Sequence, residues 1–221
     1  MTQAYFVTGT DTEVGKTYVT TALIRAVAVA GKKAIGYKPV AAGCDWHNNE
    51  WQNEDALAMQ AASNVPLTLA EINPIALEPA IAPHIAADLA NRHISEQVIA
   101  DGFHHLAARQ PDVLLMEGAG GWRLPLGQQR FMSDVVQTLA LDVIIVVGMR
   151  LGCLNHALLT AEAIQADGLT IKGWIANTLS PDMPYWEENL ATLDKLMPAP
   201  RLAIVPYQAA PDAASLATIF T

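Results

Sequence analysis

Three observations predict an α/β fold with a mostly parallel central sheet flanked by helices on both faces. Short, continuously apolar runs alternate along the 221 residues with longer segments of helical periodicity, and such runs are typical of strands covered on both sides. A repeated strand–helix–strand order implies right-handed crossovers between parallel strands. The polar residues that could carry chemistry mostly follow strands, which is where open parallel sheets bind ligands.

The apolar runs and the periodic segments each define a set of elements. We expect strands at residues 4–8, 34–38, 113–117, 143–148, 171–177 and 202–206. We expect helices at residues 17–30, 55–62, 95–108, 133–139, 154–166 and 184–197. Residues 42–54 and 66–83 are polar or proline-rich with little periodicity, so they are expected to be long loops, which are often functional.

Length and composition favour a single domain over residues 1–221 in the cytoplasm. Thirteen basic and 22 acidic residues give a formal charge of −9, which disfavours a nucleic-acid partner. The longest apolar run, around residues 143–149, is too short to span a bilayer, so no membrane partner is expected. Cys44 and Cys153 form no disulfide framework and are expected to be ordinary thiols in a reducing compartment.

The stretch YFVTGTDTEVGKTYVT places a glycine loop between an expected strand and an expected helix. This context indicates a phosphate-binding loop and hence a P-loop NTPase-like fold, with Lys16 reaching the β- and γ-phosphates and Thr17 ligating Mg²⁺. The alternative is a solvated turn with an incidental Gly-Lys-Thr. Five residues separate Gly9 from Gly15, where the standard loop has about four.

The longer loop also carries acidic side chains. Asp11 and Glu13 are not needed to hold phosphate, which is itself negative. We therefore hypothesise that the segment Thr10 to Thr12 faces a second ligand, so that two substrates meet over one loop.

Two carboxylates are placed to complete a Mg²⁺ site with Thr17. Glu117 ends an apolar strand, where a carboxylate is costly unless it is paired or bound to a metal. Asp55 opens a helix after the polar loop. The alternatives are a surface acid or N-cap for Glu117 and a helix N-cap for Asp55.

Two further polar residues end strands. Lys38 could clamp a phosphate or stabilise a developing anion, or it could simply extend to water. The amide of Asn177 could match the edge of a purine, or it could be an ordinary strand end. The guanine-selective Asn-Lys-x-Asp pattern is absent at 177–180, which favours adenine.

The segment GMRLGCLNH follows the fourth expected strand and leads into a helix. Free N–H groups at the helix start near Cys153 could bind a substrate carboxylate, or the segment could be an ordinary turn bracketed by Gly148 and Gly152. His156 is expected to be a packed or capping residue, and His104 and His105 to lie on a helix surface.

Taken in order, the segments GTDTEVGKT, GYKPVAAG, NEDALAMQ, VLLMEGAGGW, GMRLGCLNHALLTAEAI and GWIAN closely resemble the dethiobiotin synthetase family, and the resemblance extends from Tyr5 to about Pro206. It implies an ATP- and Mg²⁺-dependent ligase of biotin biosynthesis. CO₂ (or bicarbonate) would form a carbamate on 7,8-diaminononanoate, ATP would phosphorylate the carbamate, and the second amine would close the cyclic urea, releasing ADP and phosphate.

The same resemblance implies roles for particular residues. Lys16, Lys38 and Thr12 would act in catalysis, and Thr17, Asp55 and Glu117 would hold Mg²⁺. The nucleotide would contact Glu13, Val14, Gly15, Lys16, Thr17, Tyr18, Asp55, Glu117, Gly118, Ala119, Gly120, Asn177, Thr178, Pro206, Tyr207, Gln208 and Asp212. The substrate would contact Thr12, Lys38 and Ala42, and its carboxylate would be held in a homodimer by Gly152, Cys153, Leu154 and Asn155 of the second subunit.

The chain departs from the family pattern at two positions. Ala42 replaces a serine that can contact the substrate, and alanine has no side-chain donor. Asn189 stands at about the position of a tyrosine that covers the substrate chain, with Tyr185 and Trp186 nearby as possible replacements. Both departures bear on affinity more than on the reaction.

Two rival interpretations remain. A cobyrinic-acid-type synthase usually carries a glutamine-hydrolysing domain, for which 221 residues leave no room. A regulatory switch ATPase would place a second signature lysine early in the loop, where this chain has Thr10, or would carry a basic membrane-binding helix.

Overall fold

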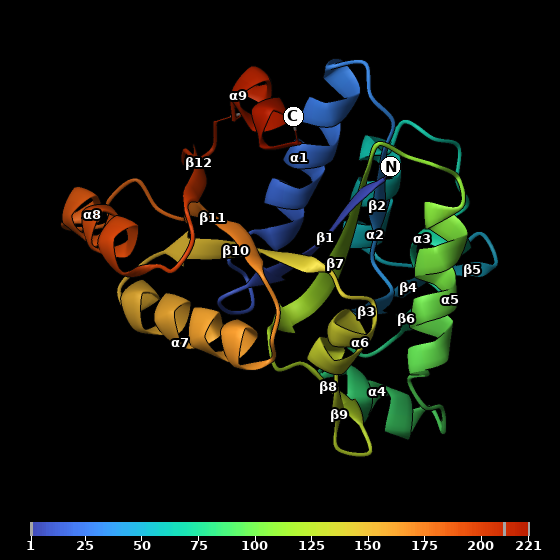
Figure 1. Ribbon diagram of the computed structural model, residues 1–221. Coiled ribbons are helices and arrows are strands. Elements are labelled where there is room, and N and C mark those ends of the chain that lie inside the picture. Colours follow the sequence, from blue (N-terminus) through green and yellow to red (C-terminus); the bar gives the residue numbers. More distant parts are fainter. Residues whose placement is uncertain (1, 210, 221) are drawn as a thin grey trace.

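The computed structural model describes residues 2–209 and 211–220. Its centre is a six-stranded sheet in which every pairing is parallel, in the order β12-β11-β10-β1-β7-β2 (Figure 1). The strands are β1 (Gln3–Gly9), β2 (Ala34–Tyr37), β7 (Val113–Gly121), β10 (Asp142–Met149), β11 (Ile171–Thr178) and β12 (Arg201–Val205). The predicted α/β class and all six expected strands are confirmed.

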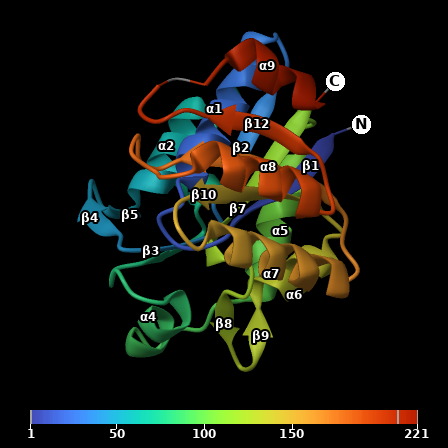
Figure 2. The same ribbon diagram turned by 90° about the vertical axis from the view of Figure 1, so that its left-hand side faces the viewer.

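Two apolar layers cover the sheet. One is built under α1 (Lys16–Val29), α2 (Glu54–Ala62), α3 (Leu69–Ile72), α9 (Ala213–Ala217) and the 3₁₀ turn Thr218–Phe220. The other lies under α4 (Pro83–Leu89), α5 (Glu96–Ala107), α6 (Met132–Thr138), α7 (Cys153–Ala166) and α8 (Trp186–Leu196). Figure 2 shows α1, α2 and α9 on one side of the strands and α5, α6 and α7 on the other. None of the helices in the described residues combines the length and apolarity that crossing a bilayer requires.

The two expected loops are more ordered than the sequence predicts. β3 (Val40–Ala42) pairs in parallel with β6 (Ile75–Leu77), and β4 (Asp45–His47) forms a hairpin with β5 (Glu50–Gln52). A second hairpin joins β8 (Pro125–Gly127) to β9 (Arg130–Phe131). Expecting only irregular structure at 42–54 and 66–83 was wrong, because elements this short carry too few residues to show a period.

The β4–β5 hairpin turns through Asn48 and Asn49, which both have the left-handed backbone that tight hairpins favour (φ 51° and 64°). Across it, the rings of Trp46 and Trp51 meet edge to face, with centroids 5.2 Å apart. Trp46 is still 55% exposed. The chain enters this hairpin from β3 and leaves it at the start of α2.

The burial of side chains beneath α1 predicts how much stability is lost when one of them is truncated to alanine. Leu23 on α1 is fully buried, so Leu23→Ala should lower the free energy of unfolding by about 2–5 kcal/mol through lost burial and a residual cavity. Urea unfolding measures this. Val29→Ala on the same helix is the control, because Val29 is 80% exposed and its truncation should change stability by less than about 0.5 kcal/mol.

Candidate active site

The glycine loop lies between β1 and α1, as predicted. Gly15 has φ +78°, and a Cβ there would lie 2.2 Å from Nδ2 of Asn177, so both the backbone conformation and the space require glycine. The Thr10 N–H donates to the Val146 carbonyl at 3.0 Å. Nδ2 of Asn177 donates to the Val14 carbonyl at 2.8 Å. Hydrogen bonds to β10 and β11 therefore hold the loop against the sheet.

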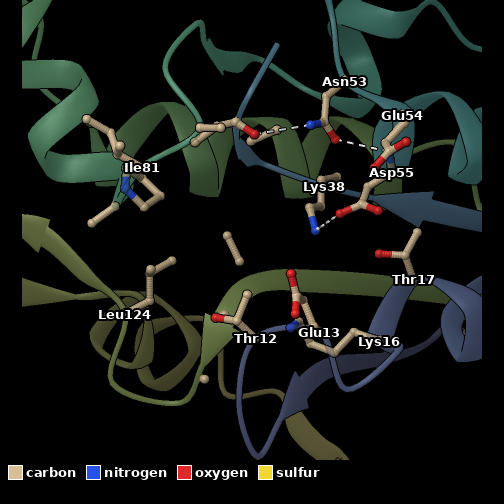
Figure 3. A pocket seen from close by; sticks show the side chains of 18 of the residues that line it. Thr12, Glu13, Lys16, Thr17, Lys38, Asn53, Glu54, Asp55, Ile81 and Leu124 are labelled. Carbon is tan, nitrogen blue, oxygen red and sulfur yellow. Dashed lines mark hydrogen bonds and ion pairs between the residues drawn. The ribbon is translucent and has the colours of Figure 1, made fainter. Parts of the chain in front are cut away.

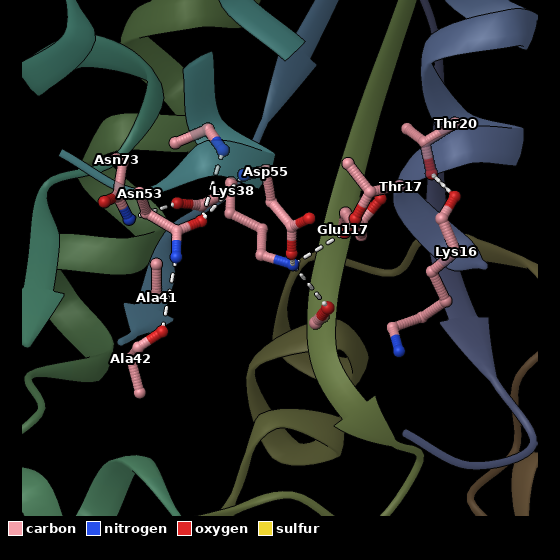
Figure 4. Close-up of polar contacts among 12 residues, drawn as sticks. Lys16, Thr17, Thr20, Lys38, Ala41, Ala42, Asn53, Asp55, Asn73 and Glu117 are labelled. Atoms are coloured by element: carbon pink, nitrogen blue, oxygen red, sulfur yellow. Dashed lines mark hydrogen bonds and ion pairs between the residues drawn. The ribbon is translucent and has the colours of Figure 1, made fainter. Parts of the chain in front are cut away.

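A buried charge cluster lies beside this loop (Figure 4). Nζ of Lys38 lies 2.9 Å from Oδ2 of Asp55 and 2.6 Å from Oε1 of Glu117. The Thr17 hydroxyl donates to the same Glu117 oxygen at 2.7 Å. Lys38 is 3% exposed and Glu117 is fully buried, so the alternatives of a water-facing lysine and a surface acid are wrong.

Asn53, which the sequence analysis missed, supports the cluster. Its Oδ1 accepts from the backbone N–H groups of Asp55 and Ala56, and its Nδ2 donates to the Ala42 carbonyl at 3.2 Å. Asn53 is thus the N-cap of α2, and the alternative that Asp55 caps this helix is wrong. Asparagine directly before Glu54 and Asp55 is a recognisable cap signal. Because Asn53 takes the capping role, Asp55 is available to Lys38.

The strand carrying Glu117 also differs from expectation. β7 continues to Gly121 rather than ending at residue 117, and Gly121 pairs with Gly9 of the phosphate loop. The pairing shifts register between Val7 and Gly9. The Gly-rich segment is therefore an extension of the sheet beneath the loop, not a free turn.

Burial and neighbouring opposite charges shift the pKa values of Lys38 and Asp55 in opposite directions. Burial alone would lower the pKa of Lys38, but Glu117 and Asp55 outweigh it and hold that pKa above its ordinary value. Burial would raise the pKa of Asp55, yet Lys38 brings it below its usual range. The pKa of Lys16 is lowered by burial and then by the neighbouring charge of Lys38.

The oxygen atoms of the cluster fit a hard cation. Within residues 2–209 and 211–220, Oε2 of Glu117 is buried without a hydrogen-bond partner. That part of the chain contains no group of three or more His, Cys, Asp or Glu side chains arranged to hold a metal. A hydroxyl and two carboxylates, from Thr17, Asp55 and Glu117, are the donors that Mg²⁺ takes when phosphate and water complete its shell.

A cavity of about 820 Å³ opens above the cluster (Figure 3). It brings together many of the expected residues: Thr12, Glu13, Gly15, Lys16, Thr17, Tyr18, Lys38, Ala42, Asp55, Ala119 and Gly120. Apolar residues absent from the expected set also line it, namely Ile81, Ala82, Pro83, Leu124 and Pro125. In Figure 3, Ile81 and Leu124 lie across the cavity from Lys16 and Thr17. The cavity therefore suits a ligand with a polar end and a hydrocarbon chain.

Other expected residues lie outside this lining. Val14, Glu117 and Gly118 are buried and do not line it. Asn177 is bonded to the loop, and Asp212 caps α9 by accepting from the Ala214 N–H. Thr178, Pro206, Tyr207 and Gln208 do not line the cavity. The Tyr18 hydroxyl donates to the Ala209 carbonyl at 2.9 Å, so the segment after β12 does lie against α1.

The turn before α7 lies outside the cavity lining too. Gly152 precedes the helix with φ +95°, and Cys153, Leu154 and Asn155 form its first turn. His156 was expected to be packed or capping, but it is half exposed, with Nδ1 4.0 Å from Oδ2 of Asp11. Its side chain faces the exposed phosphate loop rather than the apolar core, which explains the difference.

Neither the two histidines of α5 nor Asn189 lines the cavity. His104 and His105 lie on the surface of α5 as expected, and His105 contacts Glu71 at 3.0 Å. Asn189 on α8 donates to the Tyr185 carbonyl at 2.7 Å, and Tyr185 is 76% exposed.

Removing the central lysine should destabilise the fold in a pH-dependent way. Lys38→Met leaves the Glu117 carboxylate buried without its cation, so stability at pH 8 should fall by about 3–5 kcal/mol. The loss should shrink towards pH 5, because an unpaired buried carboxylate takes up a proton. Urea unfolding at both pH values measures this, with Lys33→Met at an exposed position as control. An equal loss at the two pH values would contradict the charge argument.

The fold is shared with solved structures of low sequence identity. The MinC:MinD cell division complex of Aquifex aeolicus aligns with a TM-score of 0.59 at 12% identity, covering 98% of this chain and 86% of that one. A ParA family ATPase from Chlorobium tepidum aligns with a TM-score of 0.58 at 12% identity, covering 100% and 97%. This likeness concerns the fold alone and confirms the P-loop NTPase-like class.

Sequence comparisons are more specific. The family model described as an AAA domain matches residues 3–215. The chain is 58% identical to an ATP-dependent dethiobiotin synthetase of Alteromonas mediterranea, over 96% of this chain and 95% of the relative. It is 52% identical to one of Cellvibrio japonicus, over 96% and 94%. Since these matches run along nearly its whole length, the chain belongs to the ATP-dependent dethiobiotin synthetase family.

Proposed function

We propose that this protein catalyses the ATP-dependent closure of a cyclic urea on 7,8-diaminononanoate to form dethiobiotin. The observation that carries the proposal is the cavity itself, because one end holds Lys16, Thr17 and the Lys38 cluster while apolar residues, among them Ile81 and Leu124, line the wall across from it. The substrate has the same division, with two amines at one end and a hydrocarbon chain leading to a carboxylate.

The reaction proceeds in three steps. One amine nitrogen attacks CO₂ and loses a proton, giving a carbamate. A carbamate oxygen attacks the γ-phosphorus of ATP, and ADP leaves. The second amine attacks the carbonyl carbon of the mixed anhydride, the C–O bond to phosphate breaks, the amine nitrogen loses a proton, and the urea ring closes. Such phosphoryl transfer needs positioning and charge neutralisation more than covalent help from the protein.

The chain's residues divide this work. Lys16 and the loop N–H groups bind the β- and γ-phosphates. Lys38, already held between two carboxylates, neutralises the carbamate and phosphoryl oxygens, and Thr12 contacts the diamine. Thr17, Asp55 and Glu117 hold Mg²⁺, which neutralises charge on the phosphates when bound. The adenine lies near Asn177 and residues 206–208, towards Asp212.

We further propose a homodimer in which the substrate carboxylate meets the α7 helix start, residues 152–155, of the second subunit. Exposed apolar side chains there support this: Leu151 in the turn before α7 is 97% exposed and Leu159 on α7 is 55% exposed, and side chains of this size suit an interface. We also propose that the protein acts in the cytoplasm as one ATP-binding domain over residues 1–221.

The deciding experiment measures phosphate release from MgATP with and without 7,8-diaminononanoate and bicarbonate. We expect release only when both are present, because phosphate leaves after the carbamate has formed. Lys16→Gln should lower kcat by at least about 100-fold through lost charge stabilisation, while Lys33→Gln at an exposed position should not. Release that ignores the diamine, or an active Lys16→Gln variant, would overturn the proposal.

The metal role of Glu117 has its own test. Glu117→Gln keeps the shape of the side chain but removes a negative oxygen ligand. The Mg²⁺ concentration for half-maximal turnover should rise about tenfold or more, with partial recovery of rate at high Mg²⁺. An unchanged Mg²⁺ dependence, in a variant with normal circular dichroism, would remove Glu117 from the metal site.

A further inference from the structure

The proposed reaction leaves one feature of the phosphate loop unexplained. Asp11 is an acidic residue within a loop that binds a polyanion, and a carboxylate there opposes nucleotide binding. It also falls in the stretch that carries the extra residue of this loop. Its contacts therefore bear on why the loop is longer.

Asp11 touches both loop residues to which roles are proposed. Its Oδ1 accepts from the Thr12 N–H at 2.8 Å, which fixes the direction of that peptide. Its backbone carbonyl lies 3.5 Å from Nζ of Lys16. A change in the position of Asp11 is thus passed directly to Thr12 and Lys16.

The other carboxylate oxygen of Asp11 meets a cation from a distant part of the chain. Oδ2 forms an ion pair with Nη2 of Arg150, the residue that follows β10. His156 also faces this oxygen, but its Nδ1 is farther away, at 4.0 Å. Because the preceding residue, Thr10, already bonds to Val146 of β10, the longer loop lies along β10 and reaches the turn before α7.

The exposure of the Arg150–Asp11 ion pair indicates that its role is functional rather than structural. The side chains of Arg150 and Asp11 are 44% and 42% exposed, and exposed ion pairs contribute little to folding stability. Their effect should instead appear where charge and loop position matter, at the nucleotide.

We propose that Arg150 is a positioning residue for the phosphate loop: it neutralises Asp11 and holds the longer loop so that Thr12 and Lys16 face the ligands. The inference rests on the proposed function in so far as the loop binds MgATP. It assigns a role to a residue outside the cavity lining, acting through Asp11.

The test is a double-mutant cycle read by MgATP binding in isothermal titration calorimetry, without diamine. Arg150→Gln leaves Asp11 uncompensated, so Kd should rise roughly three- to tenfold, and less at high salt because the repulsion is screened. Arg150→Lys should recover part of the loss. Asp11→Asn keeps the Oδ1 acceptor for Thr12 but removes the charge, so the double variant Asp11→Asn/Arg150→Gln should return to within about twofold of wild type.

Arg201→Gln is the matched control, because Arg201 pairs with Asp194 at 2.8 Å on the surface between β12 and α8. It should leave Kd unchanged, and all variants should keep the wild-type thermal midpoint. The inference is overturned if Arg150→Gln binds MgATP with the wild-type Kd, or if the double variant binds as weakly as Arg150→Gln alone. In either case, binding of MgATP by the wild type leaves the proposed function standing. Failure of wild type to bind MgATP overturns both.

Discussion

The need to compensate one buried carboxylate organises the active site. Glu117 is fully buried on β7, and an ionised carboxylate there requires a cation and hydrogen bonds. Lys38 at the end of β2 supplies the charge, and Thr17 at the start of α1 supplies a hydrogen bond. Asp55 then balances the lysine from α2. Four elements that are distant in sequence are thus brought to one point by the demands of a single side chain.

Such a cluster is a poor way to gain stability, since apolar side chains of the same volume would serve as well or better. Its value lies in readiness for ligands. The Lys38 ammonium already lies where the anionic oxygens of a ligand would bind. Oε2 of Glu117, which has no partner among the described residues, remains available to a metal. The same preorganisation explains why Asn53 matters, because a separate cap leaves Asp55 facing the cluster.

Much of this could be predicted from the sequence. Continuously apolar strands and the glycine loop leave clear local patterns, so the sheet and the positions of Lys16, Thr17, Lys38, Asp55 and Glu117 followed from the sequence. The apolar cavity walls did not, because Ile81 and Leu124 lie in connections outside any helix or strand, where no period marks the side chains that face inward. The contact of Asn177 with Val14 and the cap formed by Asp212 depend on tertiary placement, which no local pattern records.

The paired tryptophans of the β4–β5 hairpin, Trp46 and Trp51, provide an intrinsic spectroscopic probe of its conformation. The hairpin joins Ala42 to Asn53, and both of these residues line the cavity. Any rearrangement of the cavity mouth therefore acts on both ends of a short ribbon that carries Trp46 and Trp51 in edge-to-face contact. Since the two rings are in contact, the exciton signal of the pair reports on the hairpin without an added label.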